Sequence, residues 1–380
     1  MTKTNSVPSI LAGLTLTTLL AATQTTQAQG CVASRGSGGG MLPHGESTYL
    51  QPNSWEAFVG YRWLYSDRHF ERGVEQKHRQ AKGDDVRNDS HFFDTTITYG
   101  ISKRTSLSLT LPFVSSVRSS MYEHGAVVQG GERERHEMSA SGLADIRLVS
   151  SVWILDPESH PNGNIALGLG VKAPTGDSAV TDVKYKNPKR LNLDPKKGPI
   201  VIPDPSANYS ELGFVDQSIQ PGDGGWGVIL EAQGFQKLFH NTSGYLQMSY
   251  LITPKEVNEK TISPTVKLFD SVADSYLIRS GLSYSLWPSK GLSLSLGARM
   301  EGVPWNDWIG GNLGKRRPGY AVSIEPGVSW MYKKLAFNLT VPIAIERNRI
   351  DHYDGATGAR KSGDAAFADY TVNSSVSYRF

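Results

Sequence analysis

The sequence is short of cysteine and has no long apolar run in its interior. Its single cysteine, Cys31, excludes an internal disulfide framework and a site built from several metal-bound thiolates. Beyond the amino-terminal region no segment approaches about 18 consecutive apolar residues, so no transmembrane helix is predicted there. The formal net charge of +3 indicates no particular acidic partner, and we expect no nucleic-acid partner.

The residue patterns of an enzyme are also missing. Outer-membrane phospholipases and deacylases place a serine two residues after a histidine, so that the base activates the nucleophile. None of the 9 histidines has a serine at that offset, and the nearest arrangement is His44-Gly-Glu-Ser47. No histidine cluster or phosphate-cradling loop occurs in a fitting context. We therefore expect no catalytic residues, no cofactor and no metal site.

The amino terminus has the pattern of a secretion signal. Lys3 supplies the positive region, residues 10–22 are mildly apolar, and Thr26-Gln-Ala28 resembles a cleavage site. We predict that residues 1–28 are a signal peptide and that residues 29–53 are a flexible lead, which hangs in the periplasm or enters the barrel mouth. Cys31 lacks the leucine that a lipid-attachment motif requires three residues earlier, so a free or intermolecularly paired thiol is the simpler interpretation.

What the sequence has in abundance is alternation of apolar and polar residues. In the last stretch Tyr370, Val372, Val376, Tyr378 and Phe380 share one face of an extended strand, and the other face is polar. Alternating segments recur from about residue 55 onward and number twelve. A hydrophobic share of only 38% suits a barrel in which alternate residues face lipid.

Short and long connections alternate between these segments, as in bacterial outer-membrane barrels. The long polar loops are residues 67–89, 118–140, 174–221, 253–272, 304–318 and 347–366. Aromatic residues near the short turns predict an interfacial girdle: Tyr99, Trp153, Trp287, Trp330 and Tyr332. We therefore predict an all-β fold, a transmembrane antiparallel up-and-down β-barrel of about 12 strands over residues 54–380. We also predict short periplasmic turns, long extracellular loops and a place in the bacterial outer membrane. The alternative, a secreted sandwich, would not explain the two loop lengths together with the aromatic girdle and the terminal phenylalanine.

The alternation also predicts which charged residues face the lumen. Seven acids and seven bases fall on the polar faces: Glu56, Arg62, Asp145, Arg147, Lys172, Glu231, Lys237, Arg279, Arg299, Glu301, Glu325, Glu346, Asp369 and Arg379. This balance predicts no strong ion selectivity, and the charges either pair to fill the interior or line a channel. Twelve strands predict a narrow or partly plugged pore. Pro112 and Pro342 mark either bulges or points where strand pairing ends.

Short glycine-rich motifs connect the chain with a known family. They are Tyr-Gly-Ile-Ser-Lys-Arg at 99–104, Leu-Ser-Leu-Thr-Leu-Pro-Phe at 107–113, Gly-Leu-Ala-Asp-Ile-Arg at 142–147, Leu-Gly-Leu-Gly-Val-Lys-Ala-Pro-Thr-Gly at 167–176 and Gln-Pro-Gly-Asp-Gly-Gly-Trp at 220–226. With them the chain, over about residues 55–380, resembles the outer-membrane transporter family labelled "MetA-pathway of phenol degradation". The resemblance implies a barrel that passes small, including aromatic, compounds, and it carries over no catalytic residues.

We expect an outer-membrane channel that passes small molecules, including aromatic or hydrophobic compounds, by passive diffusion. The alternatives are a non-transporting anchor or docking barrel and, less favoured, a lipid hydrolase in the barrel wall. The expected partners are outer-membrane lipid and lipopolysaccharide, the small-molecule solute and the barrel-assembly machinery. Tyr378 and Phe380 form the terminal aromatic signal that such machinery reads.

Overall fold

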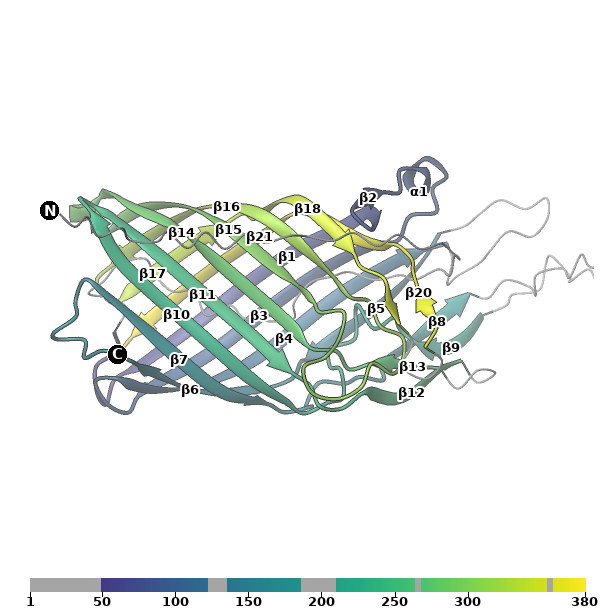
Figure 1. Ribbon diagram of the computed structural model, residues 1–380, viewed down its shortest axis with the longest axis horizontal. Coiled ribbons are helices and arrows are strands. Elements are labelled where there is room, and N and C mark those ends of the chain that lie inside the picture. Colours follow the sequence, from purple (N-terminus) through teal and green to yellow (C-terminus); the bar gives the residue numbers. More distant parts are fainter. Residues whose placement is uncertain (1–48, 122–134, 186–209, 264–267, 354–357) are drawn as a thin grey trace, which may run out of the picture.

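A closed antiparallel β-barrel forms the body of the protein in the computed structural model, which describes residues 49–121, 135–185, 210–263, 268–353 and 358–380. Twelve wall strands follow one another around the barrel, and β21 (Ala365–Arg379) pairs with β1 (Trp55–Glu71) to close it (Figure 1). The predicted fold is therefore confirmed. The expected signal peptide, Cys31 and most of the lead lie outside the described residues.

Ten wall strands are continuous. Besides β1 and β21 they are β3 (Arg87–Gly100), β4 (Thr105–Ser120), β7 (Gly163–Lys172), β10 (Gly227–Phe239), β11 (Thr242–Ile252), β14 (Ser275–Trp287), β15 (Leu292–Val303) and β16 (Gly319–Tyr332). The other two are each in two pieces: β5 (His136–Leu143) with β6 (Arg147–Trp153), and β17 (Leu335–Thr340) with β18 (Ile343–Arg349). Each break lies beside one of the two prolines noted in the sequence. Ala144, between β5 and β6, donates to the Pro112 carbonyl (2.8 Å), and Pro342 itself lies between β17 and β18, where its carbonyl accepts from Thr371 (3.0 Å).

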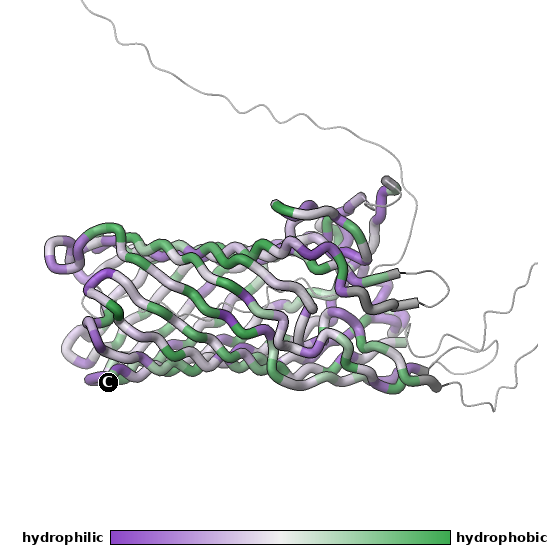
Figure 2. Tube along the Cα trace, turned by 90° about the horizontal axis from the view of Figure 1, so that it is seen from below, coloured by the Kyte–Doolittle hydropathy of each residue, from purple (hydrophilic) through white to green (hydrophobic). Residues whose placement is uncertain are grey.

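The two faces of the wall differ as the alternation predicts. Leu107, Leu109, Leu111 and Phe113 of β4 are exposed on the outside of the barrel, and the polar residues between them face inward. Figure 2 shows the same alternation of hydrophobic and hydrophilic positions along the wall strands. The outer face is thus suited to lipid, and the pairing of β21 with β1 closes the sheet, as a barrel in lipid requires.

The two ends of the barrel carry different connections. At one end tight turns join the strands, with Asn241 (φ 55°) and Lys333 (φ 54°) in left-handed conformation and the 3-10 turn η3 (Pro288–Lys290) before Gly291. The other end carries long loops with short elements of their own: β2 (Val74–Glu75), α1 (His78–Ala81), β8 (Thr181–Tyr185), β9 (Ser210–Phe214), β12 (Val257–Ser263), β13 (Leu268–Ser271), β19 (His352–Tyr353) and β20 (Arg360–Lys361). No helix among the described residues is long and apolar enough to cross a membrane.

Aromatic residues gather on the outer face at the tight-turn end. Trp330 stacks on Tyr332 and on Phe337, with ring centroids 5.8 and 5.5 Å apart, and Tyr378 stacks on Phe380 at 5.9 Å. Trp153 departs from the prediction. It lies opposite Ala166 on the inward face and is buried against Phe235, because its place in the alternation, rather than its nearness to a turn, decides its direction.

Candidate functional site

Small polar side chains line the inward face toward the tight-turn end, which is the periplasmic end in such barrels. Thr96 and Thr110 share a hydroxyl hydrogen bond of 2.9 Å across β3 and β4, and Thr98 and Ser108 share another of 2.9 Å. Such cross-strand pairs stabilise neighbouring strands without filling the space between opposite walls. The inward face between β3 and β4 is therefore polar.

Most of the charged residues predicted for the lumen lie on the inward face. They are Glu56, Arg62, Asp145, Arg147, Lys172, Glu231, Lys237, Arg279, Arg299, Glu301, Glu325 and Arg379. They do not form a single ring. They gather into a central belt, a group beneath the extracellular loops and a pair at the periplasmic end, while Lys237 is exposed at the periplasmic rim.

The central belt consists of paired charges. Arg279 of β14 lies directly opposite Arg299 of β15, an arrangement that is repulsive by itself. Arg279 donates to both carboxylate oxygens of Glu325 at 2.7 and 3.2 Å, and Arg299 donates to both oxygens of Glu301 at 3.0 and 3.2 Å. Arg62 of β1 lies 3.6 Å from Glu301. Each glutamate of the belt is therefore paired, and the three arginines exceed the two glutamates by one charge, so the belt is a mixture of both signs and not a ring of one.

Two inward residues next to this belt, Phe92 and Asp94, are missing from the set of lumen residues predicted from the sequence. The Arg62 guanidinium lies 4.5 Å from the ring centre of Phe92, and Phe92, Asp94 and Arg147 line a small cavity of about 20 Å³. The sequence could have identified both residues, because the alternation that turns Phe93 outward turns its neighbours Phe92 and Asp94 inward.

A piece of the longest loop, residues 215–221, packs against the inside of the wall at the extracellular mouth, and we call it the mouth segment. Val215 and Ile219 are buried against Met138 and Ala140 on the inward face of β5. Farther along the segment, Pro221 lines the small cavity beneath it. A segment packed in this place narrows the extracellular end, while partial plugging of the pore stays a prediction.

One carboxylate holds the mouth segment to two other parts of the barrel. The Asp216 oxygens accept two hydrogen bonds of 2.6 Å from Arg317, in the loop between β15 and β16, and lie 3.8 Å from Arg118 of β4 and 3.7 Å from Lys315. Burial raises the pKa of Asp216, but the three cations outweigh it and hold the pKa well below its usual range. The carboxylate therefore stays charged at neutral and mildly acidic pH, and the segment stays held.

A second buried cluster fixes the end of the same loop. Lys172 donates to Asp145 at 3.1 Å and to both oxygens of Asp223 at 2.5 Å, and Asp145 also accepts from the Gly176 amide at 3.0 Å. Asp145 and Lys172 are therefore inside the barrel as predicted from parity, but they anchor a loop and do not border an open passage.

The periplasmic end is partly covered from inside by the chain that precedes β1. Tyr49 packs edge-on against Trp153 and Phe235, with ring centroids 4.9 and 5.8 Å apart. Arg379 donates to Glu56 at 2.5 Å and to the Tyr49 carbonyl at 3.4 Å. Of the two placements left open for the lead, its described end enters the barrel.

Two of the predicted lumen residues lie elsewhere. Glu346 faces outward, because β18 carries an extra residue, Ile345, opposite the junction of Val322 and Ser323, and such a bulge shifts the alternation by one. Glu346 is exposed and accepts a hydrogen bond of 2.7 Å from Tyr320. Asp369 lies at a register shift of β21, and about half of its side chain is exposed.

The wall between β18 and β21 is joined by side chains where the backbone pairing stops. Beyond Pro342 these strands pair only at Ile343 and Tyr370. Arg347 of β18 donates to the Ala368 carbonyl at 3.0 Å and to Asp369 at 2.6 Å. The proline thus marks both a break in β17–β18 and the end of regular pairing with β21.

Replacing Glu325 tests the paired charges of the belt. In Glu325→Gln, Arg279 loses its ion pair in a buried setting, and we expect the free energy of unfolding to fall by about 3 kcal/mol. Denaturant titration of the barrel in vesicles measures it. The control Glu56→Gln breaks a more exposed pair and should cost below about 1 kcal/mol. Equal losses in the two variants would contradict this account of the belt.

Asp270 predicts a pH dependence of the extracellular loops. Burial raises its pKa to about 6, against the lowering influence of Lys315, and Asp216 adds to the rise. The pKa of Asp270 in the folded loop exceeds the unfolded value of about 3.9, so Asp270 binds a proton more tightly in the folded loop than in the unfolded one. The folded loop therefore becomes more stable as pH falls from 7 to 5. Hydrogen exchange of β13 amides, corrected for intrinsic rates, should slow at pH 5. Asp270→Asn should remove the difference.

Within the described ranges no group of three or more histidine, cysteine or acidic side chains is placed to hold a metal ion.

Comparisons with known proteins give a fold and no family. No family model matches the sequence, so the resemblance to the phenol-degradation family remains a prediction, and no curated protein matches it. Several solved structures, in contrast, match its fold. The COG4313 outer membrane channel from Pseudomonas putida F1 superposes with a TM-score of 0.53 at 14% identity, over 87% of this chain and 97% of that one. This chain is a barrel of the bacterial outer membrane.

Two further structures resemble the chain less. A Pseudomonas aeruginosa FadL homologue has a TM-score of 0.42 at 8% identity and covers 90% of this chain and 95% of its own. The toluene transporter TodX of P. putida has a TM-score of 0.37 at 9% identity, with coverage of 86% and 90%. Of the three superpositions only the first exceeds 0.5, and at 14% identity it establishes the shared fold alone.

Proposed function

We propose that this barrel lets small molecules cross the outer membrane by passive diffusion, small aromatic or hydrophobic compounds among them. The observation that carries the proposal is the lining of the lumen. Its inward face carries hydroxyl pairs and ion pairs beside bulky side chains such as Phe92 and Phe235, so the interior is polar over much of its lining. A polar interior inside a closed wall provides a route for solutes, and the shared fold with a solved outer-membrane channel agrees with it.

Aromatic side chains support the solute class. Phe92 and Tyr245 face the lumen, and each lies beside an arginine of the central belt, Arg62 and Arg279 respectively. Flat aromatic faces next to small polar residues offer weak contacts to aromatic solutes without tight binding, and weak contacts permit release.

Reconstitution in liposomes and planar bilayers tests the proposal. We expect measurable conductance and faster swelling with small aromatic solutes than with larger sugars. A correctly folded barrel with no conductance and no solute flux would favour a second candidate, a non-transporting anchor, which the ion pairs that hold the mouth segment also support.

A further inference from the structure

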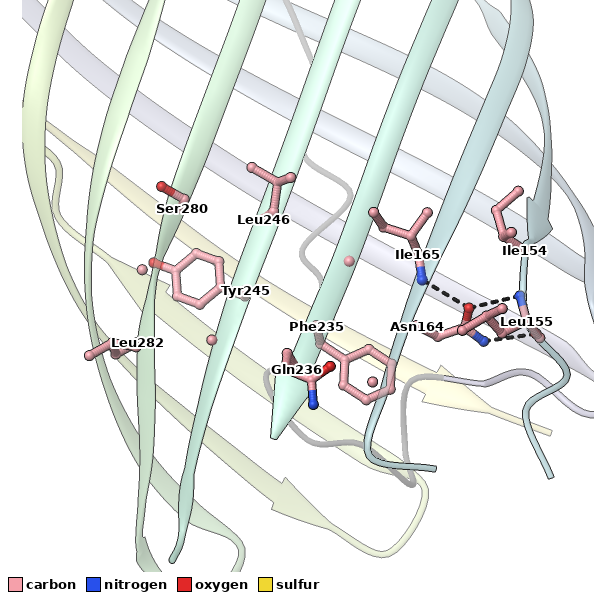
Figure 3. Close-up of a pocket in the computed structure, with 14 residues that line it drawn as sticks. Ile154, Leu155, Asn164, Ile165, Phe235, Gln236, Tyr245, Leu246, Ser280 and Leu282 are labelled. Atoms are coloured by element: carbon pink, nitrogen blue, oxygen red, sulfur yellow. Dashed lines mark hydrogen bonds between the residues drawn. The ribbon is translucent and has the colours of Figure 1, made fainter. Parts of the chain in front are cut away.

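A groove of about 710 Å³ extends across four neighbouring wall strands. It runs over β7, β10, β11 and β14 beside the β6–β7 connection (Figure 3). Its lining includes three glycines: the side chains of Gln236 and Ile165 lie over Gly163 and Gly234, whereas the position beside Gly244 is open. Ile154 and Leu282 border the groove (Figure 3).

The groove opens to the outside of the barrel. Ile165, Gly234, Leu246 and Ser280 stand opposite one another across the four strands, and Ile165 is an exposed residue of the outer face. The next row toward the periplasm contains Gln236, Gly244 and Leu282, and Leu282 is also exposed on that face. The row between them, which includes Phe235, turns inward.

Its position lies within the lipid-facing belt near the periplasmic turns. Gly244 follows the turn residue Asn241 by three residues, which places it roughly 8 Å along the barrel axis from the turn, at about 3.3 Å per residue and a tilt of about 40°. The apolar band of such barrels is about 25 Å tall, so the groove lies in its periplasmic half.

We propose that the groove binds one acyl chain of a phospholipid from the periplasmic leaflet. None of its lining residues is charged, and its few polar members include Gln236 and Ser280. An uncharged groove open to the hydrocarbon suits a fatty chain, which fills it where a flat wall would offer no recess. The recess holds that chain longer than the neighbouring lipids along the wall.

The substitution Gly244→Leu should fill the groove without disturbing the backbone. A Cβ atom built on it meets nothing closer than Leu238 Cδ1 at 3.6 Å, and its φ is not in the left-handed region. A leucine therefore fits the backbone and occupies the space. Ser280→Leu fills the groove from β14 and guards against a folding defect of the first variant. Ala232→Leu is the control, because Ala232 lies on the same outward face opposite Leu167 and Met248 but outside the groove.

The experiment is native mass spectrometry of the barrel released from nanodiscs of palmitoyl-oleoyl phosphatidylethanolamine, with folding checked by heat-modifiable mobility. We expect a one-lipid species in the wild type that falls at least about fivefold in Gly244→Leu and in Ser280→Leu and persists in Ala232→Leu. Equal lipid retention in all four proteins would overturn the proposal. A dimer lost in the two filled variants would also overturn it and would assign the groove to a second copy of the chain.

Discussion

Asp216→Asn is expected to open the extracellular mouth and raise single-channel conductance severalfold. The substitution leaves Arg317, Arg118 and Lys315 without the buried carboxylate that they share. Removing one partner from a buried ion pair costs about 3–5 kcal/mol, enough to release the mouth segment from β5 and the β15–β16 loop. Planar-bilayer recordings and liposome swelling measure the change.

Asp177→Asn is the matched control for this prediction. Asp177 belongs to the same loop and is exposed, and among the residues that the structure describes its side chain accepts a local hydrogen bond from the Ala179 amide, which asparagine also accepts. Both variants lose one negative charge, so a general electrostatic effect would alter both. Unchanged conductance in Asp216→Asn, or an equal rise in the control, would rule out the mouth segment as the barrier.

Phe380→Ala is expected to remove most of the assembled barrel from the outer membrane while leaving its intrinsic stability nearly intact. The ring is more than half exposed on the lipid-facing side, so its loss costs at most about 1 kcal/mol in detergent. The backbone hydrogen bonds of 3.0 Å that Phe380 exchanges with Trp55 are kept. If the assembly machinery reads the terminal aromatic, delivery fails although the sheet still closes.

Two measurements separate delivery from stability. Heat-modifiable barrel in isolated outer membranes reports assembly, and denaturant titration of the refolded protein reports stability. Phe380→Tyr keeps an aromatic end and should restore the wild-type amount in membranes. Normal assembly of Phe380→Ala would show that the last residue is no signal, and a large loss of stability would trace the defect to the barrel itself.

The strand arrangement was predictable from sequence because lipid imposes a simple rule. Every second residue of a wall strand must be apolar, so the alternation in residues 107–113 reveals both the strand and its faces. The rule fails where a strand departs from regular pairing. The extra residue at Ile345 reverses the direction of Glu346, and no property of the local sequence announces the bulge.

The candidate site was predictable only in part. Parity reveals inward charges such as Arg279 and Glu325, because each belongs to a regular strand. The partners of Asp216 come from positions about one hundred residues away in either direction, Arg118 and Arg317. Loops have no periodicity that would bring such residues together, so the anchoring of the mouth segment emerged only from the fold.

The length of the first strand places the mouth outside the bilayer. β1 has 17 residues, which at about 3.3 Å per residue and a tilt of about 40° rise roughly 40 Å along the barrel axis, whereas the apolar band spans about 25 Å. The wall therefore extends well beyond the hydrocarbon, into the region that we expect lipopolysaccharide to occupy. If the proposed uptake of hydrophobic solutes is right, such a solute must cross the hydrated carbohydrate of that region before it reaches the entrance, and the thickness of this layer then sets part of the rate of uptake.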